Sequence, residues 1–255
     1  KWNQLHIDSN QDWNADPFFA LLDKQLFIIT EKFIYKKRKG VIFANPINVH
    51  NGKYTFGKGV KLLENDFHLS YPFTFVKNNC TYMIPENSKN GCWLYRLELK
   101  NYKGKVLPVA KKIKKLLSGH AIDPTLITYD GFDYLFVSSL IYESQYVLNV
   151  FISKDILSED FRPHPQSPLL VNVNFGRSAG RIFVDKKNET IVRPSQICDH
   201  SYGGGIAFSE LKLSPKKIII KEMINKFITP RKYAEFKKVH HIDKFRNFLV
   251  LDFVK

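Results

Sequence analysis

The chain alternates between short runs of apolar residues and polar turns. The runs are rich in Val, Ile, Phe and Tyr, and Gly, Asn, Asp and Lys separate them, which is the pattern of β-strands joined by tight turns. Clear examples are Leu26–Thr30, Tyr71–Val76, Thr81–Ile84, Tyr134–Val137, Tyr146–Ile152, Ile182–Val184 and Phe248–Phe253. Helical periodicity is confined to two candidates, Lys111–Leu117 and Pro215–Phe227. The pattern therefore predicts an all-β protein.

The predicted strands recur as a longer unit. Each unit opens with a residue pair in front of a strand: Asp16-Pro17, Tyr71-Pro72, Asp123-Pro124, Ala179-Gly180 and, more weakly, His240-His241. The second strands of the first four units end at Glu31, Glu86, Ser138 and Gln196, and the fifth unit reaches Asp252. Successive openings lie 55, 52, 56 and about 62 residues apart. A repeat of about fifty residues with four strands is typical of a β-propeller blade.

Five such units fill the whole chain of 255 residues. We therefore predict a single domain over residues 1–255, a five-bladed β-propeller in which the N-terminal strand pairs with the last blade and closes the ring. The blades are expected at about 12–62, 67–110, 119–165, 176–222 and 225–255. The alternative is a β-sandwich in which the repeat is accidental.

A propeller brings equivalent positions together because the first strand of every blade lines the central axis. The openings contribute Asp16, Tyr71, Asp123, Ala179 and, roughly, His241, and the second-strand ends contribute Glu31, Glu86, Ser138 and Gln196. Four carboxylates, at least one histidine and several arginines are therefore expected to share one axial cleft. Clustering raises the pKa of one carboxyl in such a group and suits it to donate a proton.

Composition and charge narrow the class of protein. Apolar residues make up 44% of the chain, which excludes disorder as the main state. The net charge of +15 favours anionic partners such as nucleic acid, acidic glycans, sugar nucleotides or a membrane surface. No nucleic-acid motif accompanies this charge, so specific nucleic-acid binding is not expected. We assign the basic runs Lys36–Lys39 and Lys111–Lys115 to surface lysines that discourage strand pairing, with peripheral membrane contact as the alternative.

The remaining features concern compartment and cofactors. Cys80, Cys92 and Cys198 lack the spacing of a zinc site and are expected to be reduced thiols, which favours a cytoplasmic location, with the membrane surface as an option. We expect neither a cofactor nor a metal. No apolar run approaches the roughly 20 residues of a membrane span. The chain begins with Lys1 rather than Met, which indicates a processed chain or an excised fragment.

Several motifs resemble a known family. The sequence W-N-A-D-P-F at Trp13–Phe18 resembles the first-blade motif of the five-bladed furanosidase-type propellers of glycoside hydrolase family 43. Further motifs follow in order at His68–Phe75, Tyr82–Glu86, His164–Pro168, Gly176–Phe183 and Arg193–Gly203. Together they resemble most closely the N-terminal propeller of glucosamine inositolphosphorylceramide transferases and the propeller attached to bacterial formyltransferase-like sugar-modifying proteins. The resemblance implies a carbohydrate-active propeller that serves surface polysaccharide or glycolipid synthesis, alongside a fused or partner transferase domain.

The resemblance also implies roles for the carboxylates. In the hydrolases an Asp at the first-blade opening activates water or positions the sugar, a second Asp tunes the site, and a later-blade Glu protonates the leaving group. Asp16 matches the first position and Asp123 the second. The later turn reads Ala179-Gly180-Arg181 here, so Glu86 or Glu31 would have to supply the proton.

Arginines and aromatic residues near the openings are candidates for substrate binding. A guanidinium binds carboxylate or phosphate through two parallel hydrogen bonds, and a Trp or Tyr ring can pack against a sugar. The candidates are Trp13, His68, Tyr71, Arg177, Arg181, Arg193, Gln196 and Tyr202. The structural alternative is that the arginines neutralise the axial carboxylates, that the histidine bonds a turn and that the aromatic rings pack in the core.

Two functional hypotheses follow. In the first, the domain binds a glycan or an activated sugar, anionic ones included, in the axial cleft and cleaves or transfers a glycosidic bond. Asp16 would be the base or nucleophile, Glu86 or Glu31 the acid and Asp123 the modulator. In the second, the domain is a non-catalytic glycan-binding module that serves a fused or partner transferase.

Overall fold

The structure is a computed structural model that describes residues 12–50, 53–87, 90–142, 145–185, 188–199, 202–230 and 237–254. Strands dominate these ranges, and the short 3₁₀ helix η1 (Tyr35–Lys37) connects two of them. No helix within these ranges has the length and apolar character needed to cross a membrane.

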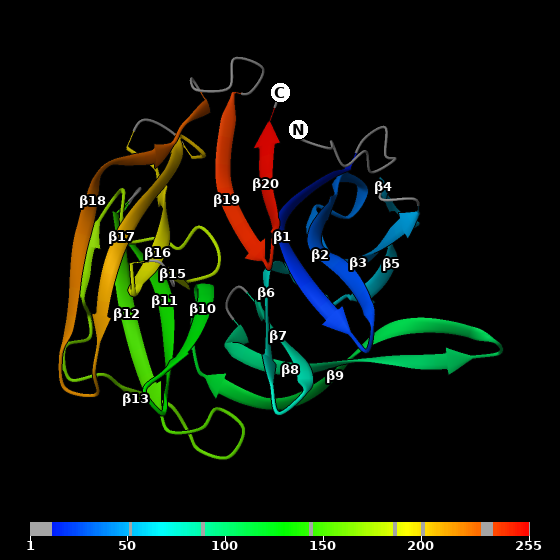
Figure 1. The fold of residues 1–255 in the computed structure, drawn as a ribbon, viewed down its shortest axis with the longest axis horizontal. Helices are drawn as coiled ribbons and strands as arrows, with labels where there is room; N and C mark the ends of the chain where they lie inside the picture. The colour runs from blue at the N-terminus through cyan, green and yellow to red at the C-terminus, as the bar shows by residue number, and fades with distance from the viewer. Residues whose placement is uncertain are drawn as a thin grey trace.

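The described strands form five antiparallel sheets (Figure 1). The first contains β1 (Trp13–Leu22), β2 (Gln25–Ile34), β3 (Lys39–His50), β4 (Lys53–Phe56) and β5 (Val60–Leu63). The second contains β6 (Ser70–Lys77), β7 (Cys80–Glu86), β8 (Cys92–Tyr102) and β9 (Lys105–Leu117). The third contains β10 (Ile122–Tyr129), β11 (Phe132–Tyr142), β12 (Gln145–Ser153), β13 (Arg162–Pro163) and β14 (Leu170–Asn172). The fourth contains β15 (Phe183–Asp185), β16 (Thr190–Ile197), β17 (Gly205–Leu213) and β18 (Ile218–Ile228), and the fifth contains β19 (Lys238–Phe245) and β20 (Phe248–Val254).

These sheets are the blades of a five-bladed β-propeller, as the repeat predicts. The strand β1 contacts both β6 and β19, and β6 contacts β10, so the inner strands of successive blades adjoin one another. The described part of the fifth blade is the β19–β20 pair. The closing strand predicted at the N-terminus falls on residues 1–11, outside the described residues. The strands β9 and β18 continue to Leu117 and Ile228, past the expected blade ends at 110 and 222.

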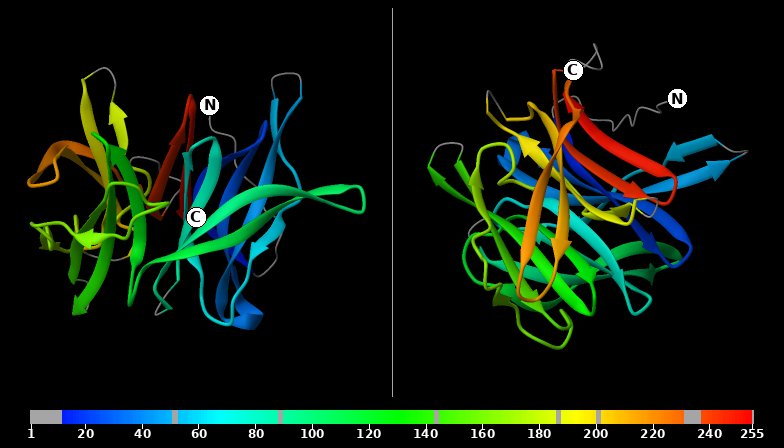
Figure 2. Two further views of the ribbon diagram at one scale, coloured as in Figure 1. Left: turned by 90° about the horizontal axis from the view of Figure 1, so that it is seen from below. Right: turned by 60° about the vertical axis from the view of Figure 1, so that its left-hand side comes forward.

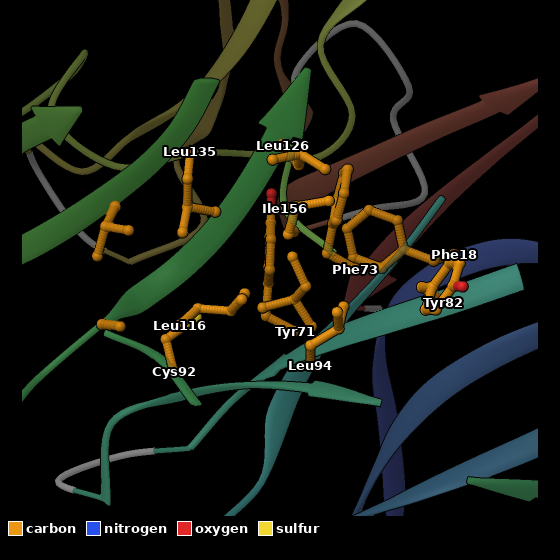
Figure 3. Packing of buried hydrophobic residues seen from close by; sticks show 13 residues of the cluster. Phe18, Tyr71, Phe73, Tyr82, Cys92, Leu94, Leu116, Leu126, Leu135 and Ile156 are labelled. Atoms are coloured by element: carbon orange, nitrogen blue, oxygen red, sulfur yellow. The ribbon is translucent and has the colours of Figure 1, made fainter. Parts of the chain in front are cut away.

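Apolar side chains that alternate along the strands are buried between neighbouring blades. At the inner strands, the Phe18 ring packs edge-on against Tyr71 and Phe73, with ring centroids 5.0 and 5.4 Å apart (Figure 3). The side chains of Leu94, Leu126, Leu135 and Ile156 extend this cluster into the second and third blades. Further clusters fill the spaces between the first and second blades and between the third and fourth. This packing holds the inner strands in fixed positions, which matters for the residues at their ends.

Both predictions of helical segments are wrong, and β-bulges explain the error. Residues Lys111–Leu117 belong to β9, where the register with β8 shifts twice and leaves Ile113 and Leu116 without partners in the ladder. The extra residues interrupt the period of two, so the apolar positions fall at helix-like intervals. Residues 218–227 belong to β18, and its pairing with β17 also shifts between Ala207 and Ser209.

The two basic runs lie on the surface and make local contacts. The strand β9 is the outer strand of its blade, and with β8 it forms a long hairpin that reaches beside the first blade (Figure 2). Lys112 Nζ lies 3.4 Å from the centroid of the Trp93 ring, and Lys114 donates a hydrogen bond to the carbonyl of Glu159. In the other run, Lys37 and Lys39 form ion pairs with Glu64. All three cysteines, Cys80, Cys92 and Cys198, are free thiols.

Candidate functional site

The inner strands of four blades share a β-bulge at their first residues. The register between β1 and β2 shifts between Ala15 and Phe18, and the same three-residue step recurs in β6, β10 and β19. The first bulged residue has a positive φ in three blades: 48° at Asp16, 42° at Tyr71 and 47° at Asp123. This backbone costs on the order of 1–3 kcal/mol at a non-glycine residue, and such strain often marks functional sites. The repeat therefore singles out this end of the propeller.

Asp16 lies where the first, second and fifth blades meet. Its Oδ2 accepts a hydrogen bond from the backbone N of Tyr71 at 3.2 Å, and its Oδ1 lies 3.3 Å from His240 Nε2 and 3.6 Å from His241 Nδ1. Burial raises the pKa of this carboxyl, but the hydrogen bond and charge of His240 outweigh burial and lower the pKa to about 2. Asp16 is therefore ionised at neutral pH.

Glu31 and Glu86 lie at equivalent positions, the ends of the second strands of their blades. Their protonation state differs from that of Asp16. Burial, together with the negative charge of Asp16, raises the pKa of Glu31 to about 9. Burial and the charge of Asp123 raise the pKa of Glu86 to about 8. Both carboxyls are therefore protonated at neutral pH and can donate a proton.

Asp123 is held by three other members of the cluster. Arg177 Nε donates a hydrogen bond to Asp123 Oδ2, and Arg177 Nη2 donates to Oδ1 at 3.4 Å. Gln196 Nε2 donates to Asp123 Oδ2 at 3.2 Å. The backbone N of Asp123 in turn donates to Glu86 Oε2 at 3.0 Å. Arg177 thus neutralises Asp123 as the structural alternative expects, and Asp123 fixes the position of the protonated Glu86.

Two predicted binding residues border the cluster and are partly open to solvent. The Tyr202 side chain is 46% exposed, and its ring lies 4.8 Å from the His240 ring and 5.0 Å from the Arg177 guanidinium. His68 Nδ1 accepts a hydrogen bond from the backbone N of Gly40 at 2.9 Å, and Nε2 lies 3.3 Å from Glu31 Oε1. Burial lowers the pKa of His68, so the ring is neutral and carries its proton on Nε2. Both side chains can meet an incoming ligand.

Two predicted binding residues, Tyr71 and Arg193, are engaged within the fold instead. Tyr71 is fully buried, and its hydroxyl bonds Thr125 Oγ1 at 2.8 Å and accepts from the backbone N of Gly180 at 2.9 Å. Arg193 is also fully buried and donates to the carbonyl of Phe175 at 2.8 Å. Neither side chain reaches solvent in this structure, so both serve as supports behind the cluster.

Arg181 and Trp13 lie apart from the carboxylates. Arg181 Nε donates to Asp243 Oδ1 at 2.7 Å, and its Nη2 lies 3.2 Å from Thr74 Oγ1. Its guanidinium is therefore already paired, and the paired groups lie three residues beyond the bulges of the inner strands. Trp13 is 42% exposed and stacks on Phe33, with ring centroids 5.2 Å apart.

Sequence reasoning missed two central residues, His240 and Asp252. The pairing of Val239 with Phe253 places His240 at the position equivalent to Asp16, one residue before the expected opening at His241. Asp252 accepts hydrogen bonds from the backbone N of Asp16 and of His241. The available signal was the fifth copy of the repeat, which runs from His240-His241 to Asp252 and lacks the proline of the first three copies.

Asp16, His240 and Asp252 have the residue types and the spacing of a metal site. One ligand atom of each residue lies within 4.8 Å of the others. A metal binds only the neutral imidazole. Burial lowers the pKa of His240, but the charges and hydrogen bonds of Asp252 and Asp16 outweigh burial and raise it to about 10. The group therefore fits an imidazolium between two carboxylates better than it fits a metal.

Two solved glycoside hydrolases are similar to this chain in fold. A thermostable family-43 glycoside hydrolase aligns with a TM-score of 0.55 over 82% of this chain and 74% of that one, at 12% identity. The family 117 glycoside hydrolase Zg3597 of Zobellia galactanivorans aligns with a TM-score of 0.56 over 86% and 74%, at 13% identity. At this level of identity the likeness establishes the five-bladed propeller fold alone.

Sequence relatives are more specific. Glucosamine inositolphosphorylceramide transferase 1 of Oryza sativa subsp. japonica is 28% identical over 239 residues, which are 90% of this chain and 31% of that protein. The protein of the same name from Arabidopsis thaliana is 25% identical over 209 residues, 80% of this chain and 26% of that protein. The chain thus spans between a quarter and a third of the length of these relatives. The family described as glucosamine inositolphosphorylceramide transferase 1, N-terminal, matches residues 4–246. The chain therefore belongs to this family of N-terminal propeller domains.

Proposed function

We propose that the domain binds a glycan or an activated sugar at the axial carboxylates and supplies acid–base chemistry for the transfer or cleavage of a glycosidic bond. The observation that carries this proposal is the division of charge states within one cluster. Asp16 is ionised beside His240, whereas Glu31 and Glu86 are protonated. Environments that move the pKa values of neighbouring carboxyls apart assign one as base and the other as acid.

The contacts give each residue a role. Glu86 is more exposed than Glu31, and its protonated carboxyl donates a proton to the leaving oxygen as the glycosidic bond breaks. Asp16 accepts the proton of the attacking hydroxyl as the new bond forms. Asp123, fixed by Arg177, orients Glu86 through its backbone N. Tyr202 and His68 border the site and contact the sugar.

The relatives suggest the first substrates to test. They are named as glucosamine inositolphosphorylceramide transferases, so a glucosamine donor and an acceptor that contains inositol phosphate are the natural choices. The proposed setting is glycolipid or surface-polysaccharide synthesis at a membrane surface, with the rest of a longer transferase as partner.

A second candidate is a glycan-binding module without catalysis. It is favoured by the engagement of Asp16, whose two carboxylate oxygens already face Tyr71 N, His240 and His241. The pairing of Arg177 with Asp123 also favours the binding module, because it leaves fewer charged groups free for acid–base chemistry.

Kinetic comparison of matched variants separates the two candidates. The chain would be incubated with nucleotide-activated glucosamine and N-acetylglucosamine, inositol-phosphate acceptors and aryl glycosides. We expect Glu86→Gln and Asp16→Asn to lower kcat by about 100-fold or more, the usual contribution of a positioned acid or base. Glu98→Gln, on the surface of β8, is the control and should leave kcat unchanged. Glycan binding without turnover in the wild type and both variants would overturn the catalytic proposal in favour of the binding module.

A further inference from the structure

A polar cavity of about 530 Å³ lies between the first and second blades. Its walls include Lys39 at the start of β3, Asp66 in front of β6, Asn87 after β7, Asn90 and Trp93 at the start of β8, and Lys112 of β9. The volume falls in the range of about 300–1,000 Å³ that is usual for ligand sites.

The cavity opens at the same end of the propeller as the carboxylate cluster. The start of β1, the end of β2 and the start of β3 lie at one end of the first blade because the strands are antiparallel, and the same holds for the second blade. Asn87 directly follows Glu86 in the chain, and Lys39 directly precedes Gly40, whose backbone N bonds His68. The cavity is therefore a neighbour of the proposed reaction site and lies further from the axis.

The charges of the cavity do not favour an anion. Lys39 is paired with Glu64 and donates to the carbonyl of Asn65. Lys112 Nζ lies 3.4 Å from the centroid of the Trp93 ring and makes a cation–π contact with the ring face. Two lysines and two carboxylates, Glu64 and Asp66, leave the wall without net charge.

The unpaired groups of the cavity suit hydroxyls. Within the described residues, the exposed carboxylate of Asp66 makes no hydrogen bond or ion pair, and neither does the side-chain amide of Asn90. Asn87 is only 2% exposed, and among the described residues no hydrogen-bond partner faces its Oδ1. Amides both donate and accept hydrogen bonds, as sugar hydroxyls do, and a buried polar atom without a partner costs about 1–3 kcal/mol. Trp93 adds an aromatic surface beside these groups.

We infer that this cavity is a second saccharide subsite, which binds a neutral or amino-sugar unit next to the one held at the carboxylates. Asp66 and Asn90 bind hydroxyl groups at its mouth, Asn87 offers its oxygen deeper in the wall, and Trp93, which carries Lys112 over one ring face, borders the sugar. The inference rests on the proposed function in one respect only, namely that the ligand is a saccharide.

Binding measurements on the full chain test the subsite. The probes are N-acetylglucosamine, its β-1,4-linked disaccharide and inorganic phosphate. Their binding is measured by tryptophan fluorescence and saturation-transfer NMR. We expect the double variant Asp66→Asn/Asn90→Ala to raise the Kd of the disaccharide at least tenfold. Asp23→Asn, in the exposed turn between β1 and β2, is the matched control and should leave the Kd unchanged. The fluorescence response should disappear in Trp93→Phe and persist in Trp13→Phe.

The outcomes distinguish this inference from the proposed function. Disaccharide binding that is lost in Glu86→Gln but unchanged in Asp66→Asn/Asn90→Ala and in Trp93→Phe overturns the subsite and leaves the axial proposal in place. Inorganic phosphate that competes with the disaccharide overturns the assignment to a sugar. If the wild type binds neither saccharide, the subsite fails, whereas the axial proposal is decided by the turnover assay with activated sugars. Circular dichroism of each variant confirms that the fold is retained.

Discussion

Asp16 and Glu31 belong to adjacent strands of one blade, yet they differ in charge at neutral pH because their neighbours differ. His240 Nε2 lies 3.3 Å from Asp16 Oδ1 and carries a positive charge, whereas Glu31 is buried beside a neutral His68 and near the negative charge of Asp16. The sequence shows both residues as carboxylates in a repeat and does not distinguish them. Their charge states depend on a histidine that lies more than 200 residues away in the chain.

The charge state of Glu31 predicts an unusual dependence of stability on pH. The folded-state pKa of about 9 exceeds the model-peptide value of 4.5, so the folded chain holds a proton that the unfolded chain releases. The free energy of unfolding contributed by Glu31 is complete below pH 4.5 and is lost as pH rises towards 9. We expect Glu31→Gln to be more stable than the wild type at pH 8, by on the order of 1–3 kcal/mol, and about equal at pH 4. Urea unfolding at both pH values measures the difference.

Glu64→Gln is the control of opposite sign. Hydrogen bonds from Lys37 and Lys61 lower the pKa of Glu64 to about 2, so its contribution is present above pH 4.5 and is lost as pH falls through 2. Glu64→Gln should therefore be no more stable than the wild type at pH 8. A stability difference between Glu31→Gln and the wild type that does not change with pH would contradict the assignment.

At the scale of strands, the bulges explain both a success and an error of sequence reasoning. The bulge at each opening carries a recognisable sequence, a residue before proline, and so the repeat could be found. The bulges in β9 and β18 have no such marker, and their extra residues give strand sequences a helix-like spacing. Tertiary pairing decides the conformation there, which local periodicity cannot reveal.

In the fourth opening the positive φ falls on Gly180, at the position of the proline in the first three copies, and a substitution of this glycine is expected to have a large effect. Its φ is 130°, and an added Cβ would lie 1.8 Å from the carbonyl oxygen of Ile242 in β19. We expect Gly180→Ala to lower the free energy of unfolding by roughly 2–4 kcal/mol, because the fourth and fifth blades must separate to admit the methyl group. Urea denaturation provides the measurement.

Gly104→Ala, in the turn between β8 and β9, is the matched control. Its φ is also positive, at 83°, but an added Cβ meets nothing within 4 Å. Only the backbone penalty applies, about 1–2 kcal/mol. Equal losses of stability in the two variants would show that the contact between the blades does not constrain Gly180.

At the scale of the molecule, the repeat predicts the five-bladed propeller because its period, strand content and number of copies all agree with the chain length. The repeat also leads to the meeting of Asp16, Glu31, Glu86 and Asp123, since equivalent positions converge at the axis. Side-chain partners are less accessible to such reasoning. Arg181 follows the fourth opening, which has diverged from the others, and it pairs with Asp243 instead of bordering the axial carboxylates. No pattern along the chain indicates this choice of partner. His240 was overlooked because its copy of the repeat has diverged.

Closure of the ring depends on side chains that join the first and last blades. Asp243 of β19 accepts a hydrogen bond from the backbone N of Phe19 in β1 at 2.8 Å and pairs with Arg181. Its side chain is fully buried, and removal of one partner from a buried ion pair is strongly destabilising. We expect Asp243→Ala to lower the free energy of unfolding by roughly 3 kcal/mol and to open the junction between β1 and β19 before the other blades.

Asp133 offers a comparison within the ring. It is equally buried, pairs with Lys77 and accepts from the backbone N of Ile156, so Asp133→Ala should lose similar stability through the second and third blades. Hydrogen exchange resolves the two cases, because local opening exposes only the amides of the affected strands. In Asp243→Ala the amides of β1 and β19 should exchange faster, whereas in Asp133→Ala those of β6 and β10 should. If β1 and β19 exchange at the same rate in both variants, Asp243 does not close the ring, and the junction is held by its other contacts, such as the bond from Asp16 N to Asp252.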